Sequence, residues 1–136
     1  MSKLVVDTNV LLSSFIGAGL PRLIVDRIRD RLDLLCVSPP ILEEYLMALR
    51  RAGIAEDLLA SLFSLFQDPD HVLLIYPSRH VEVIPEDPSD NMFLECAIEA
   101  GVDYLIYGDR HLKTLKSFQG IEIITPREYL SRLRGR

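Results

Sequence analysis

The chain of 136 residues alternates short apolar segments with longer amphipathic segments. The short segments have the length of strands, and the long ones repeat their apolar residues at helical spacing. Because strands that alternate with helices form parallel sheets with helices on both faces, we expect an α/β fold with a mostly parallel sheet. No linker, repeat or low-complexity stretch divides the sequence, so residues 1–136 are expected to form a single domain.

Turn and capping residues place the predicted elements. Ser38 is the expected cap of one helix, with Pro39 at its first helical position, and Gly101 is the expected terminator of another. The predicted helices cover residues 8–15, 21–31, 39–51, 56–66, 88–100 and 126–133. The predicted strands cover residues 3–6, 34–37, 72–76, 81–84, 104–107 and 121–124.

Charge and cysteine content narrow the class of protein. A net charge of −5 argues against a surface coated in positive charge for nucleic acid, but it is compatible with a local basic patch. Cys36 and Cys96 lack CxxC spacing and lie in apolar segments, which favours buried free thiols over a disulfide. The amino terminus has no signal-peptide pattern, and no apolar run reaches membrane-spanning length. We therefore expect a soluble, cytoplasmic protein without membrane association.

Two acidic residues directly follow predicted strands. Asp7 comes after an apolar run and opens helical sequence, and Asp109 follows the strand predicted over 104–107 and Gly108. The carboxyl ends of parallel strands meet at one edge of a sheet, so adjacent strands would bring these carboxylates together. The alternative for Asp109 is that it caps the following turn.

A third acid, Asp90, lies in the first turn of the helix predicted over 88–100. Helical spacing puts it on one stripe with Leu94 and Ala97, so its carboxylate is expected to point towards the sheet. The alternative is a capping-box position behind Asp87, the expected N-cap, which explains an acid here but not its orientation.

The helix predicted over 39–51 offers two adjacent acids, Glu43 and Glu44. They border its apolar face on opposite sides, with Glu44 slightly nearer, and periodicity barely separates them. A solvated helix acid is the alternative for either. If these carboxylates share one pocket, two like charges about 4 Å apart repel by about 4 kcal/mol at an effective dielectric near 20. Such a cluster takes up protons or binds a cation, and hard oxygen ligands favour Mg²⁺ or Mn²⁺ and metal-assisted phosphoryl transfer.

Four motifs follow one another along the chain. They are Val5-Val6-Asp7-Thr8-Asn9-Val10, Ser38-Pro39-Pro40-Ile41-Leu42-Glu43-Glu44-Tyr45, Asp87-Pro88-Ser89-Asp90-Asn91-Met92-Phe93-Leu94-Glu95-Cys96-Ala97 and Asp103-Tyr104-Leu105-Ile106-Tyr107-Gly108-Asp109. In this order and spacing the chain resembles a PIN domain from residue 3 to about 130, most like the branch described as toxins of toxin–antitoxin pairs. The resemblance implies a three-layer α/β/α sandwich with a central parallel sheet, and cleavage of RNA with Mg²⁺ or Mn²⁺.

The resemblance also assigns the site. It carries the family's four acids onto Asp7, Glu44, Asp90 and Asp109, with Asn9 as a supporting polar group. Asp7 and Asp90 would hold the principal metal ion, Glu44 would orient water or share a metal, and Asp109 would complete the metal shell. The implied reaction is in-line attack of metal-bound water on a phosphodiester, which leaves a 5′-phosphate.

The chain departs from the family pattern at two positions. Tyr107 stands where many relatives have Thr or Ser, and His111 stands where many have a second Asp. These departures favour one strongly held ion over two. His111 could itself be a ligand, and an exposed histidine after a turn is the alternative.

Basic residues beside the acids are the expected contacts to RNA phosphates. Arg110 and Lys113 follow Asp109, and Lys116 and Arg22 are further candidates, although each could be an ordinary solvated charge. The resemblance further implies an antitoxin protein whose segment would cover the acidic pocket, and a homodimer.

Two other functions stay open. The departures from the family pattern allow a non-catalytic PIN-like module that binds RNA or protein. A phosphatase of the haloacid-dehalogenase type also begins with an acid after its first strand, but it needs a second acid where this chain has Asn9.

Overall fold

The structure is a computed structural model that describes residues 1–17, 19–78, 91–108 and 117–134. Its helices are α1 (Thr8–Ile16), α2 (Leu20–Arg29), α3 (Pro39–Arg51), α4 (Glu56–Phe66), α5 (Asn91–Ala100) and α7 (Pro126–Arg134). Its strands are β1 (Ser2–Val6), β2 (Asp33–Val37), β3 (Val72–Leu74), β4 (Tyr104–Ile106), β5 (Ser117–Phe118) and β6 (Ile121–Ile124). The strand predicted over 81–84 lies outside the described residues, as do the first three residues of the helix predicted over 88–100.

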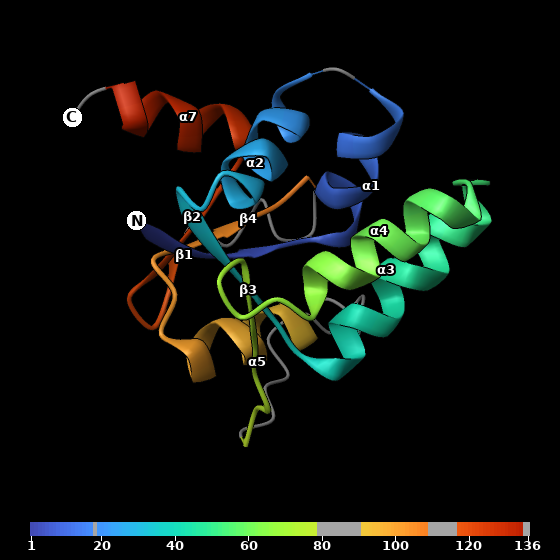
Figure 1. The fold of residues 1–136 in the computed structure, drawn as a ribbon. Coiled ribbons are helices and arrows are strands. Elements are labelled where there is room, and N and C mark those ends of the chain that lie inside the picture. Colours follow the sequence, from blue (N-terminus) through green and yellow to red (C-terminus); the bar gives the residue numbers. More distant parts are fainter. Residues whose placement is uncertain (18, 79–90, 109–116, 135–136) are drawn as a thin grey trace.

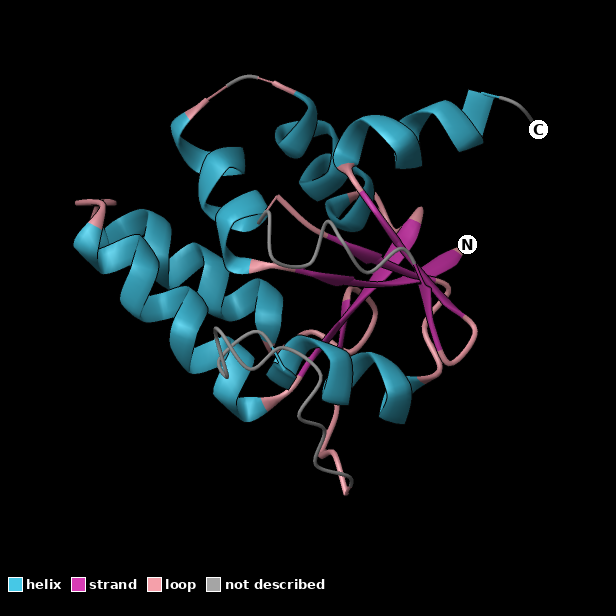
Figure 2. Ribbon diagram, turned by 180° about the vertical axis from the view of Figure 1, so that it is seen from behind, coloured by secondary structure: helices cyan, strands magenta, loops and turns pink. Residues whose placement is uncertain are grey.

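The strands form one sheet in the order β3-β2-β1-β4-β6-β5. Every neighbouring pair is parallel except β5 and β6, which are antiparallel. Helices α2 and α7 cover one face of this sheet and α5 covers the other (Figures 1 and 2). The predicted α/β fold with a mostly parallel sheet is therefore confirmed.

The order of the strands reverses beside β1. The chain adds β2 and then β3 on one side of β1, and after α5 it crosses to β4 on the other side. In open α/β sheets such a reversal leaves a crevice at the carboxyl ends of the two central strands, which is where these folds bind ligands. Here those strands are β1 and β4. The α3–α4 pair lies beside the same end of β1 (Figure 1).

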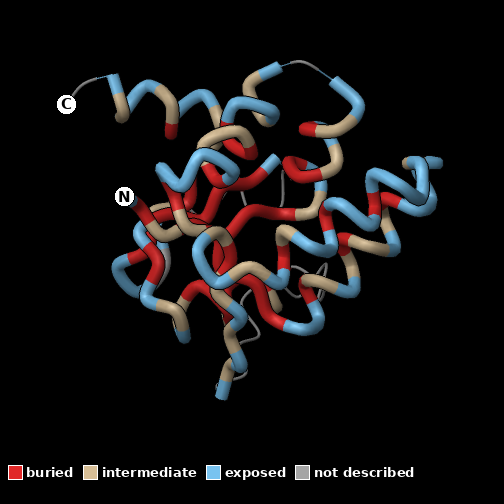
Figure 3. The backbone as a smooth tube through the Cα atoms, in the orientation of Figure 1, coloured by how far each residue is buried: buried red, intermediate tan, exposed pale blue. Residues whose placement is uncertain are grey.

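Buried residues fill the strands and the helix faces that meet them (Figure 3). Both cysteines are free and fully buried, as predicted. Burial raises the pKa of the Cys36 thiol to about 11 and that of Cys96 to about 12, so both stay protonated at neutral pH. Within the described ranges no single helix is long and apolar enough to cross a membrane; α1 and α2 reach that length and apolar content only when taken together, and they are bent by 95° relative to each other.

Two strands and one cap differ from the sequence expectations, and the first difference is that β3 ends at Leu74 and not at residue 76. Strand β5 was not predicted, and it is joined to β6 by Gln119 and Gly120, both with positive φ. Two-residue hairpin loops with two positive φ values usually carry Asn-Gly, so Gln-Gly gives a weak signal. Ser38 does occupy the N-cap of α3, but its side chain makes no cap hydrogen bond in the described part of the chain. Pro40 removes one of the two usual donors, because an N-cap side chain accepts from the second or third helical residue and proline has no N–H; the N–H of Ile41, the third helical residue, is not used by Ser38.

Candidate active site at the carboxyl end of the sheet

Asp7 joins β1 to α1 and is only 3% exposed. Its Oδ1 accepts a hydrogen bond of 2.8 Å from the backbone N–H of Val10, which makes Asp7 the N-cap of α1. Its Oδ2 accepts a second bond of 2.8 Å from the N–H of Gly108, at the end of β4. The two bonds fix the carboxylate at the crevice between β1 and β4, where the amino end of α1 favours negative charge.

Gly108 lets the two strand ends approach each other. A Cβ atom at this position would lie 3.3 Å from the Cγ2 atom of Val10, which is tighter than ordinary van der Waals contact. The N–H of Asp7 also donates to the carbonyl of Ile106, at 2.9 Å. The predicted meeting of strand ends is therefore observed as far as Gly108. Asp109 itself lies outside the described residues.

Glu44 reaches the same end of the sheet from α3. Its Oε2 accepts a hydrogen bond of 2.5 Å from the hydroxyl of Thr8, the residue after Asp7. Glu44 is partly buried, whereas Glu43 is exposed. The structure thus separates two acids that helical periodicity could not, because a contact with α1 decides which of them turns inward.

Tyr45 anchors α3 to β1. The side chain is fully buried, and its hydroxyl donates to the carbonyl oxygen of Val6, the residue before Asp7. Burial raises the pKa of Tyr45 well above its usual value, and the nearby charges of Asp7 and Glu44 add to the effect. The hydroxyl therefore remains a donor, and it holds Glu44 in register with the end of β1.

The other predicted site residues divide into two groups. Asn9 is exposed on the first turn of α1. Asp90, Asp109, Arg110, Lys113, His111 and Lys116 lie outside the described residues. On the described part of α5, Leu94 and Ala97 are fully buried and Asn91 is only 4% exposed. The stripe on which the sequence puts Asp90 is thus the buried face of this helix.

Tyr107, one of the departures from the family pattern, directly follows β4 and lies in the hydrophobic core, only 5% exposed. Burial raises its pKa, and the nearby carboxylate of Glu128 raises it further. Its backbone N–H donates to the carbonyl of Ile124, at 3.0 Å. These contacts give Tyr107 a packing role.

The donor chemistry of this edge suits a hard divalent cation. Asp7 and Glu44 offer carboxylate oxygens, and a carboxylate oxygen that accepts one hydrogen bond keeps further lone-pair capacity for a cation. Within the described ranges, no three His, Cys, Asp or Glu side chains gather closely enough to hold a metal ion. Two of the four predicted acids lie outside those ranges. The described residues thus supply half of the predicted acidic set.

Sequence reasoning missed three groups that shape this site: the hydroxyl of Thr8, the hydroxyl of Tyr45 and the backbone N–H of Gly108. Thr8 stands beside Asp7, which was a usable signal. Tyr45 gave no signal beyond its place in the second motif, because nothing in the sequence shows which group its hydroxyl contacts. The amide of Gly108 becomes visible only once β1 and β4 are neighbours.

Comparison with known proteins identifies the family. A comparison with curated proteins found no match. A family model described as PIN domain matches residues 3–111, which is most of the chain. The matched region begins in β1 and runs past β4, so it contains both strand ends that meet at Asp7. The chain therefore belongs to the PIN domain family, whose members generally have a nuclease-type fold and act as hydrolases with divalent metal ions.

Proposed function

We propose that the protein is an endoribonuclease that depends on Mg²⁺ or Mn²⁺ and acts as the toxin of a toxin–antitoxin pair. The observation that carries this proposal is the arrangement around Asp7. Its buried carboxylate is fixed by two backbone N–H groups at the reversal of the strand order. Glu44 accepts a hydrogen bond from Thr8, the residue that follows Asp7. Such fixed oxygen donors are what a catalytic metal site requires.

Asp7, Asp90 and Asp109 would hold the ion, with Glu44 beside it and Asn9 as a supporting group. A bound divalent ion would supply an activated water and neutralise charge on the scissile phosphate. The protein's own contribution is orientation. Val10 and Gly108 prevent the Asp7 carboxylate from rotating, and the amino end of α1 adds partial positive charge where a phosphate would approach.

Glu44 is the proposed base that orients the attacking water. Its Oε2 is occupied by the hydroxyl of Thr8, so the second carboxylate oxygen is the one that faces the substrate in this proposal. Tyr45 keeps this geometry by tying the adjacent residue of α3 to β1. A carboxylate held in this way meets the positional demand on a general base.

RNA is the proposed substrate, with Arg110 and Lys113 as the proposed contacts to its phosphates. The chain carries a net charge of −5, so affinity for RNA would come from a few local cations and the metal ion. The proposed partner is an antitoxin whose segment covers the acidic pocket, and the toxin would act in the cytoplasm, as a homodimer.

The test is RNA cleavage with Mn²⁺, with wild type compared against Asp90→Asn. The substitution is expected to abolish cleavage without loss of thermal stability, because it removes a charge that repels its neighbours. Asp87→Asn is the matched control. Asp87 is the expected N-cap and asparagine caps equally well, so cleavage should persist. Unchanged cleavage by Asp90→Asn would contradict the site assignment.

The toxin role is tested separately. A small reading frame upstream of the gene should encode the antitoxin, and its co-expression should relieve growth arrest caused by the nuclease. Growth that is unaffected by the wild-type protein would remove the toxin role and leave the nuclease assignment intact.

The second candidate function is a non-catalytic module that binds RNA or protein. The core position of Tyr107 favours it, because this tyrosine stands where many relatives have a small hydroxyl residue. If Mn²⁺ fails to raise the melting temperature and Asp7→Asn is as stable as wild type, the assignment as a non-catalytic binding module replaces the assignment as a nuclease.

A further inference from the structure

A second polar pocket lies where α1, α2 and α4 meet. Its volume is about 140 Å³, and its walls include Phe15 from α1, Leu58 from α4, and Arg22, Asp26 and Arg29 from α2. Figure 1 shows α1 between α2 and α4 at the end of the sheet where β1 leads into α1. The pocket is separate from Asp7 and Glu44.

The charged side chains of this pocket share one face of α2, because residues four and seven positions apart lie on the same side of a helix. Arg22 and Arg29 are both exposed, and the Arg29 guanidinium lies over the Phe15 ring, 5.9 Å from its centroid. Neither arginine forms an ion pair within the part of the chain that the structure describes. Arg27 of the same helix differs, since its guanidinium pairs with Asp33 at 2.8 Å.

These groups match the parts of a nucleotide. Guanidinium groups bind phosphate through paired hydrogen bonds, and an aromatic ring with a neighbouring arginine stacks against a base. The carboxylate of Asp26 would weaken a site for a bare anion. It suits a nucleotide, because an Asp carboxylate accepts hydrogen bonds from the amino and ring N–H groups of bases.

The pocket lies where one RNA strand could contact both it and the candidate active site. Phe15 follows Thr8 by seven residues, so the two side chains lie on the same side of α1, separated by about 10 Å along the helix axis. Thr8 contacts Glu44 directly. An RNA strand bound at Glu44 could therefore continue along α1 into the pocket.

We propose that this pocket binds one nucleotide of the RNA substrate at a distance from the cleaved bond: Arg22 and Arg29 take its phosphate, Phe15 stacks on its base and Asp26 accepts from the base edge. The inference rests on the proposed function, because it names a subsite for that substrate. It adds an RNA-binding site that is independent of the metal ion and of Arg110 and Lys113.

The test measures binding of a fluorescently labelled single-stranded RNA by anisotropy, with EDTA present so that no metal-dependent cleavage occurs. Arg29→Ala should weaken binding on the order of tenfold and lower the slope of log affinity against log salt by about 0.7. Phe15→Leu keeps an apolar side chain but removes the stacking surface, so it should weaken binding on the order of tenfold with an unchanged salt slope.

The control is Arg31→Asn. Arg31 is an exposed arginine after α2 that pairs with Asp70 at 3.5 Å, and its φ of 60° is well tolerated by asparagine. It also loses one positive charge, so it should leave affinity nearly unchanged. Melting temperatures of all variants establish that they are folded.

The outcomes separate this inference from the proposed function. If Arg29→Ala weakens binding but wild type cleaves no RNA with Mn²⁺, the pocket stands and the nuclease assignment falls. If wild type cleaves RNA but Arg29→Ala and Phe15→Leu bind it as tightly as Arg31→Asn does, the pocket is not an RNA subsite. Wild type that binds no RNA overturns the inference outright.

Discussion

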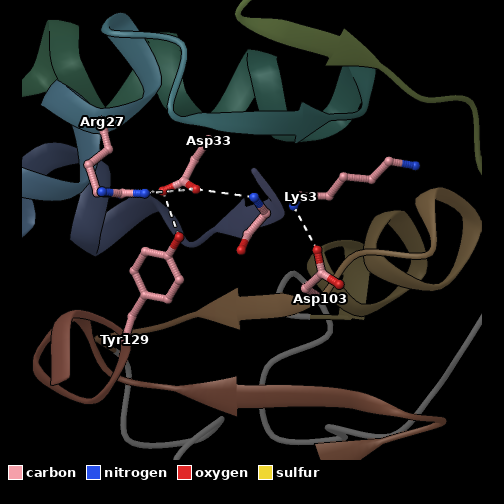
Figure 4. Close-up of polar contacts among 6 residues, drawn as sticks. Lys3, Arg27, Asp33, Asp103 and Tyr129 are labelled. Carbon is pink, nitrogen blue, oxygen red and sulfur yellow. Dashed lines mark hydrogen bonds and ion pairs between the residues drawn. The ribbon is translucent and has the colours of Figure 1, made fainter. Parts of the chain in front are cut away.

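Two buried aspartates lie at opposite ends of the parallel strands of one sheet, and their hydrogen-bond partners differ. Asp7 lies at the carboxyl end of β1, and Asp33 lies at the amino end of β2, only 1% exposed. Asp33 accepts hydrogen bonds from the Arg27 guanidinium at 2.8 Å and from the Tyr129 hydroxyl at 2.6 Å (Figure 4). The two bonds described for Asp7 come from backbone N–H groups.

The difference separates a structural acid from a candidate catalytic one. A full positive charge beside Asp33 neutralises the buried carboxylate, and its partners tie α2 and α7 to the sheet. Two backbone N–H groups orient the Asp7 carboxylate at the carboxyl end of β1, where a carboxylate is a suitable ligand for an oxygen-seeking cation. The contacts at the amino ends of the strands thus stabilise the fold. The carboxyl ends, where α/β proteins bind their ligands, carry the proposed active site.

Lys3 and Asp103 extend the structural role of the amino edge. The backbone N–H of Lys3 donates to Oδ2 of Asp103 at 2.9 Å (Figure 4), and the Lys3 ammonium donates to the Ala100 carbonyl at 3.3 Å. These bonds join the beginning of β1 to the turn between α5 and β4. They fix the relative position of the two strands whose other ends meet at Asp7.

The largest expected effect on stability comes from Asp33→Ala. Removal of the carboxylate leaves the Arg27 charge without its partner and the buried Tyr129 hydroxyl without its acceptor. The expected loss is about 3 kcal/mol in the free energy of unfolding, measured with urea. RNA cleavage by the folded fraction should be retained. A loss below about 1 kcal/mol would end the contrast between the two aspartates.

A smaller effect, on activity, is expected from Thr8→Val. Valine has nearly the shape of threonine but cannot donate to Glu44, so the carboxylate loses its orienting bond. Groups that orient ligands or bases are typically worth about 10–100-fold in activity, and a tenfold loss in cleavage rate is expected here. Thr8→Ser keeps the hydroxyl and serves as the control. Equal rates for the valine and serine variants would remove Thr8 from the site.

The smallest expected effect concerns alkaline pH. Burial, helped by the hydrogen bond to Asp33, raises the pKa of Tyr129 to about 12 from its usual value near 10. The unfolded chain therefore loses this proton first, and stability should fall as pH rises from about 10 to about 12. Tyr129→Phe has no such proton. Its unfolding free energy should decline less than that of wild type over this range, and parallel declines would contradict the coupling.

Much of the fold follows from sequence pattern. Helix α4 matches the prediction over 56–66, and the alternation of strands with helices gives the parallel sheet. Strand β5 could not be predicted, because a strand of two residues has no detectable periodicity. The contact between Glu44 and Thr8 could not be predicted, because it depends on how α1 and α3 pack together. Asp33 was not singled out, since an acid before a strand resembles a turn residue until Arg27 and Tyr129 are seen around it.

The central claim is that the carboxyl edge binds a divalent ion through Asp7, and calorimetric titration with Mn²⁺ tests it most directly. Wild type should bind one ion, and Asp7→Asn should bind it at least about tenfold more weakly. Asp70→Asn removes an equal charge from an exposed position, 66% accessible, and should bind as wild type does. Equal Mn²⁺ affinity for wild type and Asp7→Asn would contradict the account.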